Sequence, residues 1–171
     1  MQRLRIVIAD DHPLVLMGMT DLLNKDLSFD VVATLASPTA LVEHMKRDLP
    51  QVVITDYSMP GDEIYGDGIR LVKYLIRHFP GARIVVLTMV SNPMIISALY
   101  DAGVEAVVFK RDDLGEIVTA LHALQLGRKY YPPVSSARVR WPRATSSSAS
   151  ASTACRPRNS RYCGISSAAN R

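Results

Sequence analysis

The chain has 171 residues, of which 48% are apolar, enough for a hydrophobic core and too many for a chain that is disordered throughout. The net charge of +4 conceals two unlike parts: residues 1–135 hold 13 basic and all 16 acidic residues, whereas residues 136–171 hold seven arginines and no acid. No apolar run approaches the ~20 residues of a membrane span, and the first residues do not form a signal peptide, so we expect a soluble cytoplasmic protein.

Strand-like and helix-like segments alternate along the first 130 residues. Short runs rich in β-branched residues predict five strands, namely Leu4–Ala9, Asp30–Thr34, Val52–Thr55, Arg83–Leu87 and Ala106–Phe109. Several are almost continuously apolar, which is typical of strands buried on both faces of a parallel sheet. Amphipathic periodicity and capping residues predict five helices, namely Pro13–Asn24, Pro38–Arg47 after an N-cap at Ser37, Asp67–His78, Pro93–Ala102, and Asp112–Leu126 before a stop at Gly127. This order predicts an α/β fold, a doubly wound parallel sheet with helices on both faces.

Chemically active side chains stand at the carboxyl ends of four predicted strands. Asp10 and Asp11 follow the first strand, Asp56 the third, Thr88 the fourth and Lys110 the fifth. Taken singly, each has an ordinary explanation, because an aspartate after a strand often caps a helix or forms a turn, a threonine fills a strand and a lysine is a solvated charge. Because the carboxyl ends of parallel strands meet at one edge of the sheet, we expect all five side chains to converge there.

A phosphoacceptor site needs this combination of groups. Carboxylates a few ångström apart repel one another, and Mg²⁺, which prefers oxygen ligands and keeps positions for water and phosphate, relieves that repulsion. One ionised carboxylate can then attack phosphorus to form an aspartyl phosphate. The metal and a fixed ammonium group offset the charge on the phosphoryl oxygens. A hydroxyl that turns toward the new phosphate supplies a conformational switch.

Four ordered motifs resemble those of bacterial response-regulator receivers. They are Ile8-Ala9-Asp10-Asp11-His12-Pro13, Ile54-Thr55-Asp56-Tyr57-Ser58-Met59-Pro60-Gly61, Val86-Leu87-Thr88 and Phe109-Lys110. The resemblance covers residues 4 to about 133, and the first motif is typical of the NarL/FixJ class. Within that class, the segments Ser58–Asp62, Tyr65–Ile69, Lys73-Tyr74 and Arg77–Pro80 are similar to those of the capsule-synthesis regulators.

The resemblance implies a role for each matching residue. Asp56 corresponds to the phosphoacceptor. The expected cofactor is Mg²⁺, bound by Asp10, Asp11, Asp56 and the backbone carbonyl of Ser58. The implied activity is phosphotransfer to the protein's own aspartate with slow autodephosphorylation, rather than turnover of an external substrate.

Two further roles and a fold follow from the same resemblance. Thr88 corresponds to the switch hydroxyl and Lys110 to the lysine that pairs with the phosphate. The implied fold is flavodoxin-like (CheY-like), with strand order 2-1-3-4-5. The implied partners are a histidine kinase or phosphotransfer protein and a second copy in a homodimer, with no membrane, and with DNA only through a domain that we do not recognise in this chain.

The sequence departs from the family pattern at three places. Val107 stands where many receivers carry an aromatic residue that reports the state of the switch, so we do not transfer that mechanism. Arg111 replaces a common proline after the lysine, and a cis peptide there is not expected. The segment Gly61–Gly68 is longer than usual; its acids either tune entry to the site or, the simpler interpretation, are solvated loop charges: Asp62, Glu63 and Asp67.

The last part of the chain has a different composition. We divide the chain into a receiver, residues 1–133, and a tail, residues 134–171. Arg, Ser and Ala fill 23 of the 36 positions from Ser136 to Arg171, which predicts disorder. Cys155 and Cys163 do not have the spacing of a zinc site.

We hypothesise that a frameshift replaced a helix-turn-helix domain in this part of the chain. Translating the encoding DNA in the other two frames tests this hypothesis. The alternative is a naturally short receiver.

Functions from three classes remain to be compared. The first is a phosphoaccepting signalling switch that controls dimerisation and transcription, or a stand-alone receiver that acts through protein contacts alone. The second is a hydrolase with an aspartyl-phosphate intermediate, which usually needs an acid two residues after the nucleophile, where this chain has Ser58. The third is a nucleotide-binding domain, which needs a glycine-rich loop where this chain has Asp10–Pro13.

Overall fold

The computed structural model describes residues 3–113 and 115–132, and these contain one five-stranded parallel sheet. The strands are β1 (Leu4–Ala9), β2 (Phe29–Leu35), β3 (Val52–Asp56), β4 (Arg83–Thr88) and β5 (Ala106–Phe109). Their order is β2-β1-β3-β4-β5, with every neighbouring pair parallel. The predicted flavodoxin-like topology is therefore confirmed.

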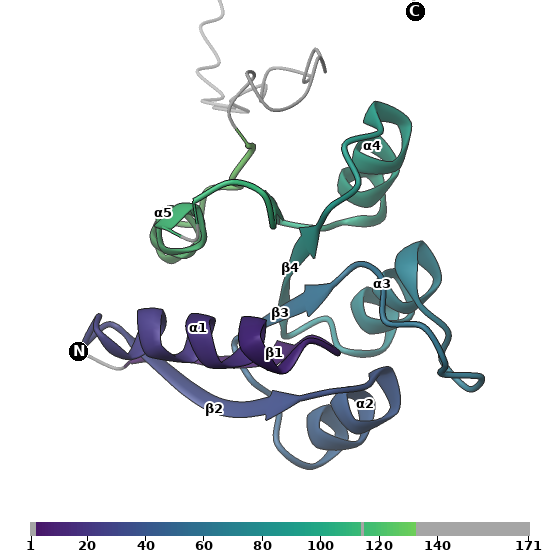
Figure 1. Ribbon diagram of the computed structural model, residues 1–171, viewed down its shortest axis with the longest axis horizontal. Coiled ribbons are helices and arrows are strands. Elements are labelled where there is room, and N and C mark those ends of the chain that lie inside the picture. Colours follow the sequence, from purple (N-terminus) through teal and green to yellow (C-terminus); the bar gives the residue numbers. More distant parts are fainter. Residues whose placement is uncertain (1–2, 114, 133–171) are drawn as a thin grey trace, which may run out of the picture. The chain divides into compact units, whose positions relative to one another are not determined.

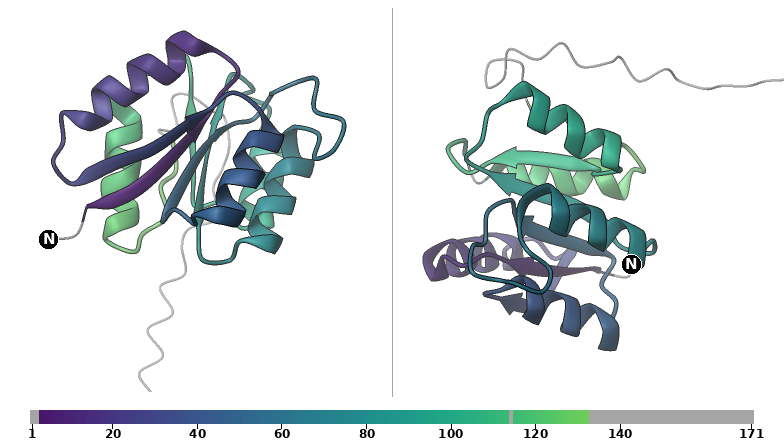
Figure 2. Two further views of the ribbon diagram at one scale, coloured as in Figure 1. Left: turned by 90° about the horizontal axis from the view of Figure 1, so that it is seen from below. Right: turned by 90° about the vertical axis from the view of Figure 1, so that its right-hand side faces the viewer.

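Within the described part of the chain, five helices cover the two faces of the sheet. They are α1 (Pro13–Asn24), α2 (Pro38–Arg47), α3 (Gly68–His78), α4 (Pro93–Ala102) and α5 (Gly115–Gln125). Figure 1 shows α1 and α5 on one side of the strands and α2, α3 and α4 on the other. The two further views in Figure 2 show the same division. Every β-to-α connection leaves the sheet at the carboxyl end of a strand, so these loops share one edge.

The core is formed on both faces because the strands are apolar on both. Alternate residues of the strands, such as Ile6, Ile54 and Val85, belong to the core cluster that includes α1 and α5. The residues between them, such as Val53 and Val86, are also fully buried. This explains the nearly continuous apolar runs of β1, β3, β4 and β5, which are buried on both faces, whereas the edge strand β2 is only partly buried.

Most predicted boundaries match, and the differences are small. β3 extends one residue further than predicted because Asp56 still pairs with Leu87 of β4. α3 begins at Gly68 rather than Asp67; the φ angle of Gly68 is +57°, and a Cβ atom there would lie 3.3 Å from the Tyr57 ring. α5 begins at Gly115, whose backbone N–H donates to Oδ1 of Asp113.

The long loop after β3 is anchored by one of its acids. Oδ2 of Asp62 accepts hydrogen bonds from the backbone N–H of Thr39 (2.7 Å) and from its hydroxyl (2.6 Å), in the first turn of α2. Oδ1 accepts from the backbone N–H groups of Ile64 (3.0 Å) and Tyr65 (2.8 Å). The interpretation of Asp62 as a solvated loop charge is therefore wrong, because its carboxylate joins the loop to α2.

Replacing Asp62 with alanine is expected to lower the free energy of unfolding by about 1.5 kcal/mol, because four N–H or O–H donors lose their acceptor. Burial acts to raise the pKa of Asp62, but the hydrogen bonds from Thr39 and the loop outweigh it and the pKa is lowered. The stabilisation is thus present at neutral pH and lost as the pH falls through that pKa. Urea denaturation at neutral and acidic pH should show the difference between wild type and variant shrinking with acidification. A difference that is constant with pH would contradict this assignment.

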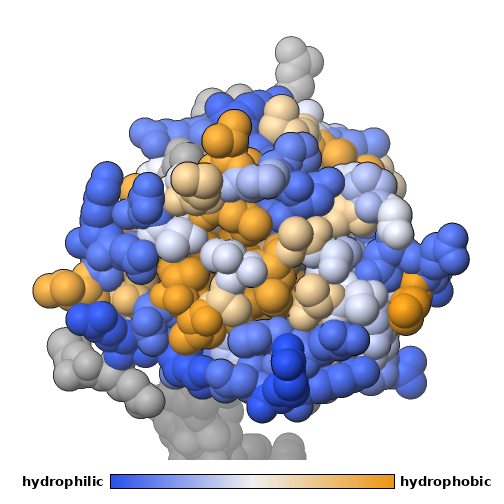
Figure 3. Space-filling view, turned by 60° about the horizontal axis from the view of Figure 1, so that its bottom comes forward, coloured by the Kyte–Doolittle hydropathy of each residue, from blue (hydrophilic) through white to orange (hydrophobic). Residues whose placement is uncertain are grey.

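Apolar side chains also gather on the surface. Figure 3, which brings the lower side of Figure 1 forward, shows an apolar area in the middle of that face. A shallow pocket of about 260 Å³ lies between α1 and β2, lined by Leu16, Met17, Thr20, Asp21 and Thr34.

Among the helices that the structure describes, none combines the length and apolar character needed to cross a membrane.

Candidate phosphoacceptor site

Backbone hydrogen bonds continue past the strand ends and bring the predicted site residues to one edge. The N–H of Asp10, just after β1, donates to the carbonyl of Leu35 at 3.0 Å. On the other side of the sheet's centre, the N–H of Lys110 donates to the carbonyl of Thr88 at 2.9 Å. Asp56 is the last residue of β3, between these two pairs of strands. The parallel topology therefore produces the predicted convergence.

Two buried carboxylates share one ammonium group at the centre of the site. Nζ of Lys110 lies 2.7 Å from Oδ2 of Asp56 and 2.7 Å from Oδ2 of Asp10. Asp10 is fully buried, Asp56 is 5% exposed, and the Lys110 side chain is 12% exposed. Only the contact with Asp56 has the geometry of a hydrogen bond. Among the described residues no group makes a hydrogen bond of good geometry to the buried Oδ2 of Asp10, so the charge of the nearby Lys110 ammonium compensates it.

Burial and charge act in opposite directions on these groups. Burial raises the pKa of Asp56, and the negative charge of Asp10 adds to this, while Lys110 acts to lower it; the net pKa is raised. Burial acts to lower the pKa of Lys110, but the contacts with Asp10 and Asp56 outweigh burial and raise it. The lysine therefore stays protonated, and it is the charge that makes two neighbouring buried acids tolerable.

The remaining acid and a histidine complete a cluster that suits a metal ion. One ligand atom each from Asp10, Asp11, His12 and Asp56 lie within 4.8 Å of one another. Three of these groups are carboxylates, the ligands that Mg²⁺ prefers, and one carboxylate oxygen, Oδ2 of Asp10, has no hydrogen bond within the part of the chain that the structure describes. The residues therefore fit a hard divalent cation, with Asp10, Asp11 and Asp56 as the natural oxygen ligands.

His12 is a member of this cluster that the sequence did not single out. Its Nδ1 lies 3.0 Å from Oδ1 of Asp10 and 2.8 Å from Oδ1 of Asp11, while 64% of its side chain is exposed. Its backbone N–H also donates to Oδ1 of Asp10 at 2.9 Å. The only sequence signal for this contact is that His12 directly follows two aspartates. The backbone N–H and the side chain of a residue just after an aspartate can turn back to contact its carboxylate.

The site opens to solvent through a small cleft of about 340 Å³. Its lining includes five of the six predicted residues and four others: Asp11, His12, Asp56, Ser58, Pro60, Thr88, Met89, Val90 and Lys110. The sixth predicted residue, Asp10, lies beneath it, in contact with Lys110. The hydroxyl of Thr88 accepts a hydrogen bond from the N–H of Val90 at 2.9 Å, which holds it at the start of the β4–α4 loop.

Tyr100 of α4 contacts Val107 of β5, the position at which many receivers carry an aromatic residue. The hydroxyl of Tyr100 accepts from the N–H of Val107 (3.1 Å) and donates to the carbonyl of Tyr130 (2.7 Å). The hydroxyl of Tyr130 in turn donates to Glu116 of α5. The face formed by α4, β5 and α5 is therefore joined by tyrosine hydroxyls, although Val107 itself is a buried aliphatic residue.

The fold and the cleft define a receiver of the two-component type. The model of the response regulator receiver domain family matches residues 6–122, and the chain belongs to this family. Among its relatives is the transcriptional regulatory protein RcsB of Salmonella typhi, which is 46% identical over 132 residues, covering 77% of this chain and 61% of that protein. The predicted resemblance to the NarL/FixJ class and to its capsule-synthesis regulators is thereby confirmed.

Solved structures give the same result. The isolated REC domain of RcsB from Salmonella enterica serovar Typhimurium, in the presence of the phosphomimetic BeF3-, has a TM-score of 0.73 and 44% identity, covering 77% of this chain and 94% of that chain. The structure of two RcsB dimers bound to two parallel DNAs has the same TM-score and identity, with 64% of that chain covered. The chain thus spans about three-fifths of the length of the curated relatives it matches, the part that contains the receiver. The predicted tail lies outside the described residues.

Proposed function

We propose that Asp56 accepts a phosphoryl group from a phosphohistidine donor, with Mg²⁺ bound at the same cleft. The observation that carries the proposal is the meeting of three carboxylates and one lysine at the carboxyl edge of the sheet, with two of those carboxylates buried. Buried like charges repel, so this cluster lowers the stability of the fold. A function in binding a cation and phosphate explains why the carboxylates are nevertheless placed together.

The metal ligands that we propose are Asp10, Asp11, Asp56 and the backbone carbonyl of Ser58, which lines the same cleft as Asp11 and Asp56. When bound, Mg²⁺ would supply positive charge to the phosphoryl oxygens. His12 pairs with Asp10 and Asp11 and orients both carboxylates. Its imidazole is a poorer ligand than oxygen for this ion, so we assign it a positioning role.

The chemical step uses the carboxylate of Asp56 as the nucleophile. An oxygen of Asp56 forms a bond to phosphorus, the bond between phosphorus and the donor's imidazole nitrogen breaks, and the electron pair of that bond stays with the nitrogen. Lys110, which now neutralises Asp10 and Asp56, then pairs with a phosphoryl oxygen. The ammonium group thus offers the same positive charge before and after transfer, which lowers the cost of reorganisation.

The switch that we propose begins at Thr88. Its hydroxyl oxygen accepts from the N–H of Val90, and a phosphoryl group on Asp56 would offer a strong acceptor to the Thr88 O–H across the same cleft, which rotates the hydroxyl away from Val90. Turning of the hydroxyl toward phosphate removes the bond that holds the start of the β4–α4 loop. Because Tyr100 connects α4 with β5, a shift of that loop changes the face formed by α4, β5 and α5.

The partners follow from this role. Exposed apolar side chains on α1 (Leu14, Met17), in the cleft lining (Met89) and on α4 (Met94) suit the docking of a helical phosphodonor such as a histidine kinase or phosphotransfer protein. A structure of RcsB contains dimers bound to DNA. We propose that this receiver forms a homodimer and that the whole protein controls transcription. Its proposed location is the cytoplasm, where kinases supply the phosphoryl group. A receiver that acts through protein contacts alone is the alternative. An aspartyl-phosphate hydrolase is disfavoured by Ser58.

Acetyl phosphate supplies a small donor that tests the proposal without a kinase. We expect the intact mass of the protein to increase by one phosphoryl group in the presence of Mg²⁺, and not when EDTA removes the metal. The reason is that Asp10 and Asp56 repel an incoming phosphate unless a cation is present. A protein that gains no mass, or that gains it equally with EDTA, would contradict the proposal.

A further inference from the structure

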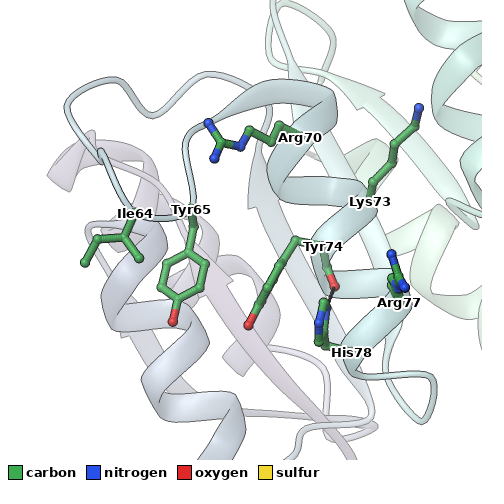
Figure 4. A pocket seen from close by; sticks show the side chains of 7 residues that line it. All are labelled: Ile64, Tyr65, Arg70, Lys73, Tyr74, Arg77 and His78. Atoms are coloured by element: carbon green, nitrogen blue, oxygen red, sulfur yellow. Dashed lines mark hydrogen bonds between the residues drawn. The ribbon is translucent and has the colours of Figure 1, made fainter.

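A second pocket, away from the carboxylate cleft, lies between the β3–α3 loop and α3. Its volume is about 410 Å³, and its lining consists of Ile64, Tyr65, Arg70, Lys73, Tyr74, Arg77 and His78. Figure 4 shows the rings of Tyr65, Tyr74 and His78 in a row, with Arg70 and Lys73 above it and Arg77 to its right. The proposed phosphotransfer uses none of these residues.

The three rings form a continuous ladder. The ring centroids of Tyr65 and Tyr74 are 4.9 Å apart at an interplanar angle of 54°, and those of Tyr74 and His78 are 4.0 Å apart at 21°. Nδ1 of His78 lies 2.9 Å from the carbonyl of Tyr74, which fixes the orientation of the imidazole. Nζ of Lys46 lies 3.3 Å from the Tyr65 hydroxyl. These contacts keep aromatic surface in place at a position that solvent reaches.

The charged residues of the pocket are all basic. Arg70, Lys73 and Arg77 are exposed, and within residues 3–113 and 115–132 no ion pair joins any of them to an acid. No Asp or Glu lines the pocket, although residues 1–135 as a whole have more acids than bases. Like charges three and four residues apart on a helix repel one another weakly, and a bound anion would relieve that repulsion.

We propose that this pocket binds a purine nucleotide, with the base against the tyrosine rings and the phosphates among the basic side chains. The Tyr74 ring lies between Tyr65 and His78, so the Tyr65 ring at the end of the row offers the stacking surface to a base, and arginine offers paired N–H donors to phosphate. The volume lies within the range of small-molecule pockets. A nucleic-acid chain would need a longer basic track than one helix face, and an acidic protein segment would not require the ring ladder. The proposal does not depend on phosphorylation of Asp56.

Calorimetric titration of the whole chain in EDTA tests this, because removal of divalent metal separates the pocket from the carboxylate cleft. We expect ATP or GTP to bind, and adenosine, guanosine and inorganic phosphate each to bind at least about tenfold more weakly, since each presents half of the ligand. The double variant Arg70→Ala/Arg77→Ala should lower nucleotide affinity at least about tenfold. The matched control Arg128→Ala/Lys129→Ala, which removes two exposed charges elsewhere, should not change it.

Four results would overturn the proposal. They are the absence of binding by both nucleotides, equal binding of inorganic phosphate, equal loss in the control variant, and tighter binding of a glutamate-rich peptide, which would indicate a protein partner instead. Circular dichroism of both double variants verifies that they are folded. Binding by Asp56→Asn should equal that of wild type, so that failure of the pocket and failure of the phosphoacceptor assignment are distinguished.

Discussion

Replacing Asp56 with asparagine is expected to abolish phosphorylation by acetyl phosphate. An amide has no ionised oxygen to attack phosphorus, and it is also a weaker metal ligand than a carboxylate. Intact-mass measurement should show a phosphoryl gain for wild type and none for the variant under identical Mg²⁺. Asp101→Asn is the matched control, because Asp101 is exposed on α4 and away from the cleft lining; it should be phosphorylated like wild type.

The same variant should remain folded. Asparagine is close in size to aspartate, and the change removes one of two buried negative charges while Lys110 keeps its contact with Asp10. We therefore expect the free energy of unfolding to be unchanged or higher, because repulsion between the two acids is relieved. A variant that still gains a phosphoryl group would show that the acceptor lies elsewhere, and a variant that unfolds would show that Asp56 is mainly a structural residue.

Removing Lys110 is expected to have the largest effect on stability at the site. Lys110→Ala leaves Asp10, which is fully buried, and Asp56 without the only lysine or arginine that pairs with them among the described residues. Breaking a buried ion pair in this way costs about 3 kcal/mol, because an uncompensated charge stays behind. Urea denaturation in metal-free buffer measures the loss. Added Mg²⁺ should return part of it, since a cation at the carboxylates replaces the missing charge.

Two controls separate the charge from the side chain. Lys129→Ala, on an exposed lysine, should change the free energy of unfolding by less than about 0.5 kcal/mol. Adding Asp10→Asn to Lys110→Ala should return part of the stability, because one of the two unpaired charges is gone. If Lys110→Ala unfolds at the same urea concentration as wild type, the proposed compensation of the buried acids by this lysine is wrong.

The sequence predicts the sheet well because its signals are local. β1 and β5 match the predicted bounds, since each is a short apolar run ended by a charged residue. The N-cap of α2 also matches: the Ser37 hydroxyl accepts from the N–H of Ala40. The convergence of Asp10, Asp56 and Lys110 follows from topology alone, because parallel strands place all their carboxyl ends at one edge.

Contacts between distant residues could not be predicted in this way. The bond between Asp62 and Thr39 joins residues 23 apart, and the sequence offers only a turn-rich loop at Asp62. The bond between Tyr100 and Val107 depends on how α4 packs beside β5. The basic and aromatic residues of α3 have helical spacing, but only the folded loop brings Tyr65 against Tyr74. Such contacts depend on packing, and a single sequence records packing only indirectly.

Locating the phosphoryl group tests the central claim most directly. After reaction with acetyl phosphate and Mg²⁺, borohydride reduction converts an aspartyl phosphate to homoserine, and tryptic cleavage after Arg47 and Arg70 isolates residues 48–70 for sequencing by mass spectrometry. The acids clustered at the edge of the sheet require the modified residue to be Asp56. Modification of His12, of Asp11 or of any residue outside this peptide would contradict the account.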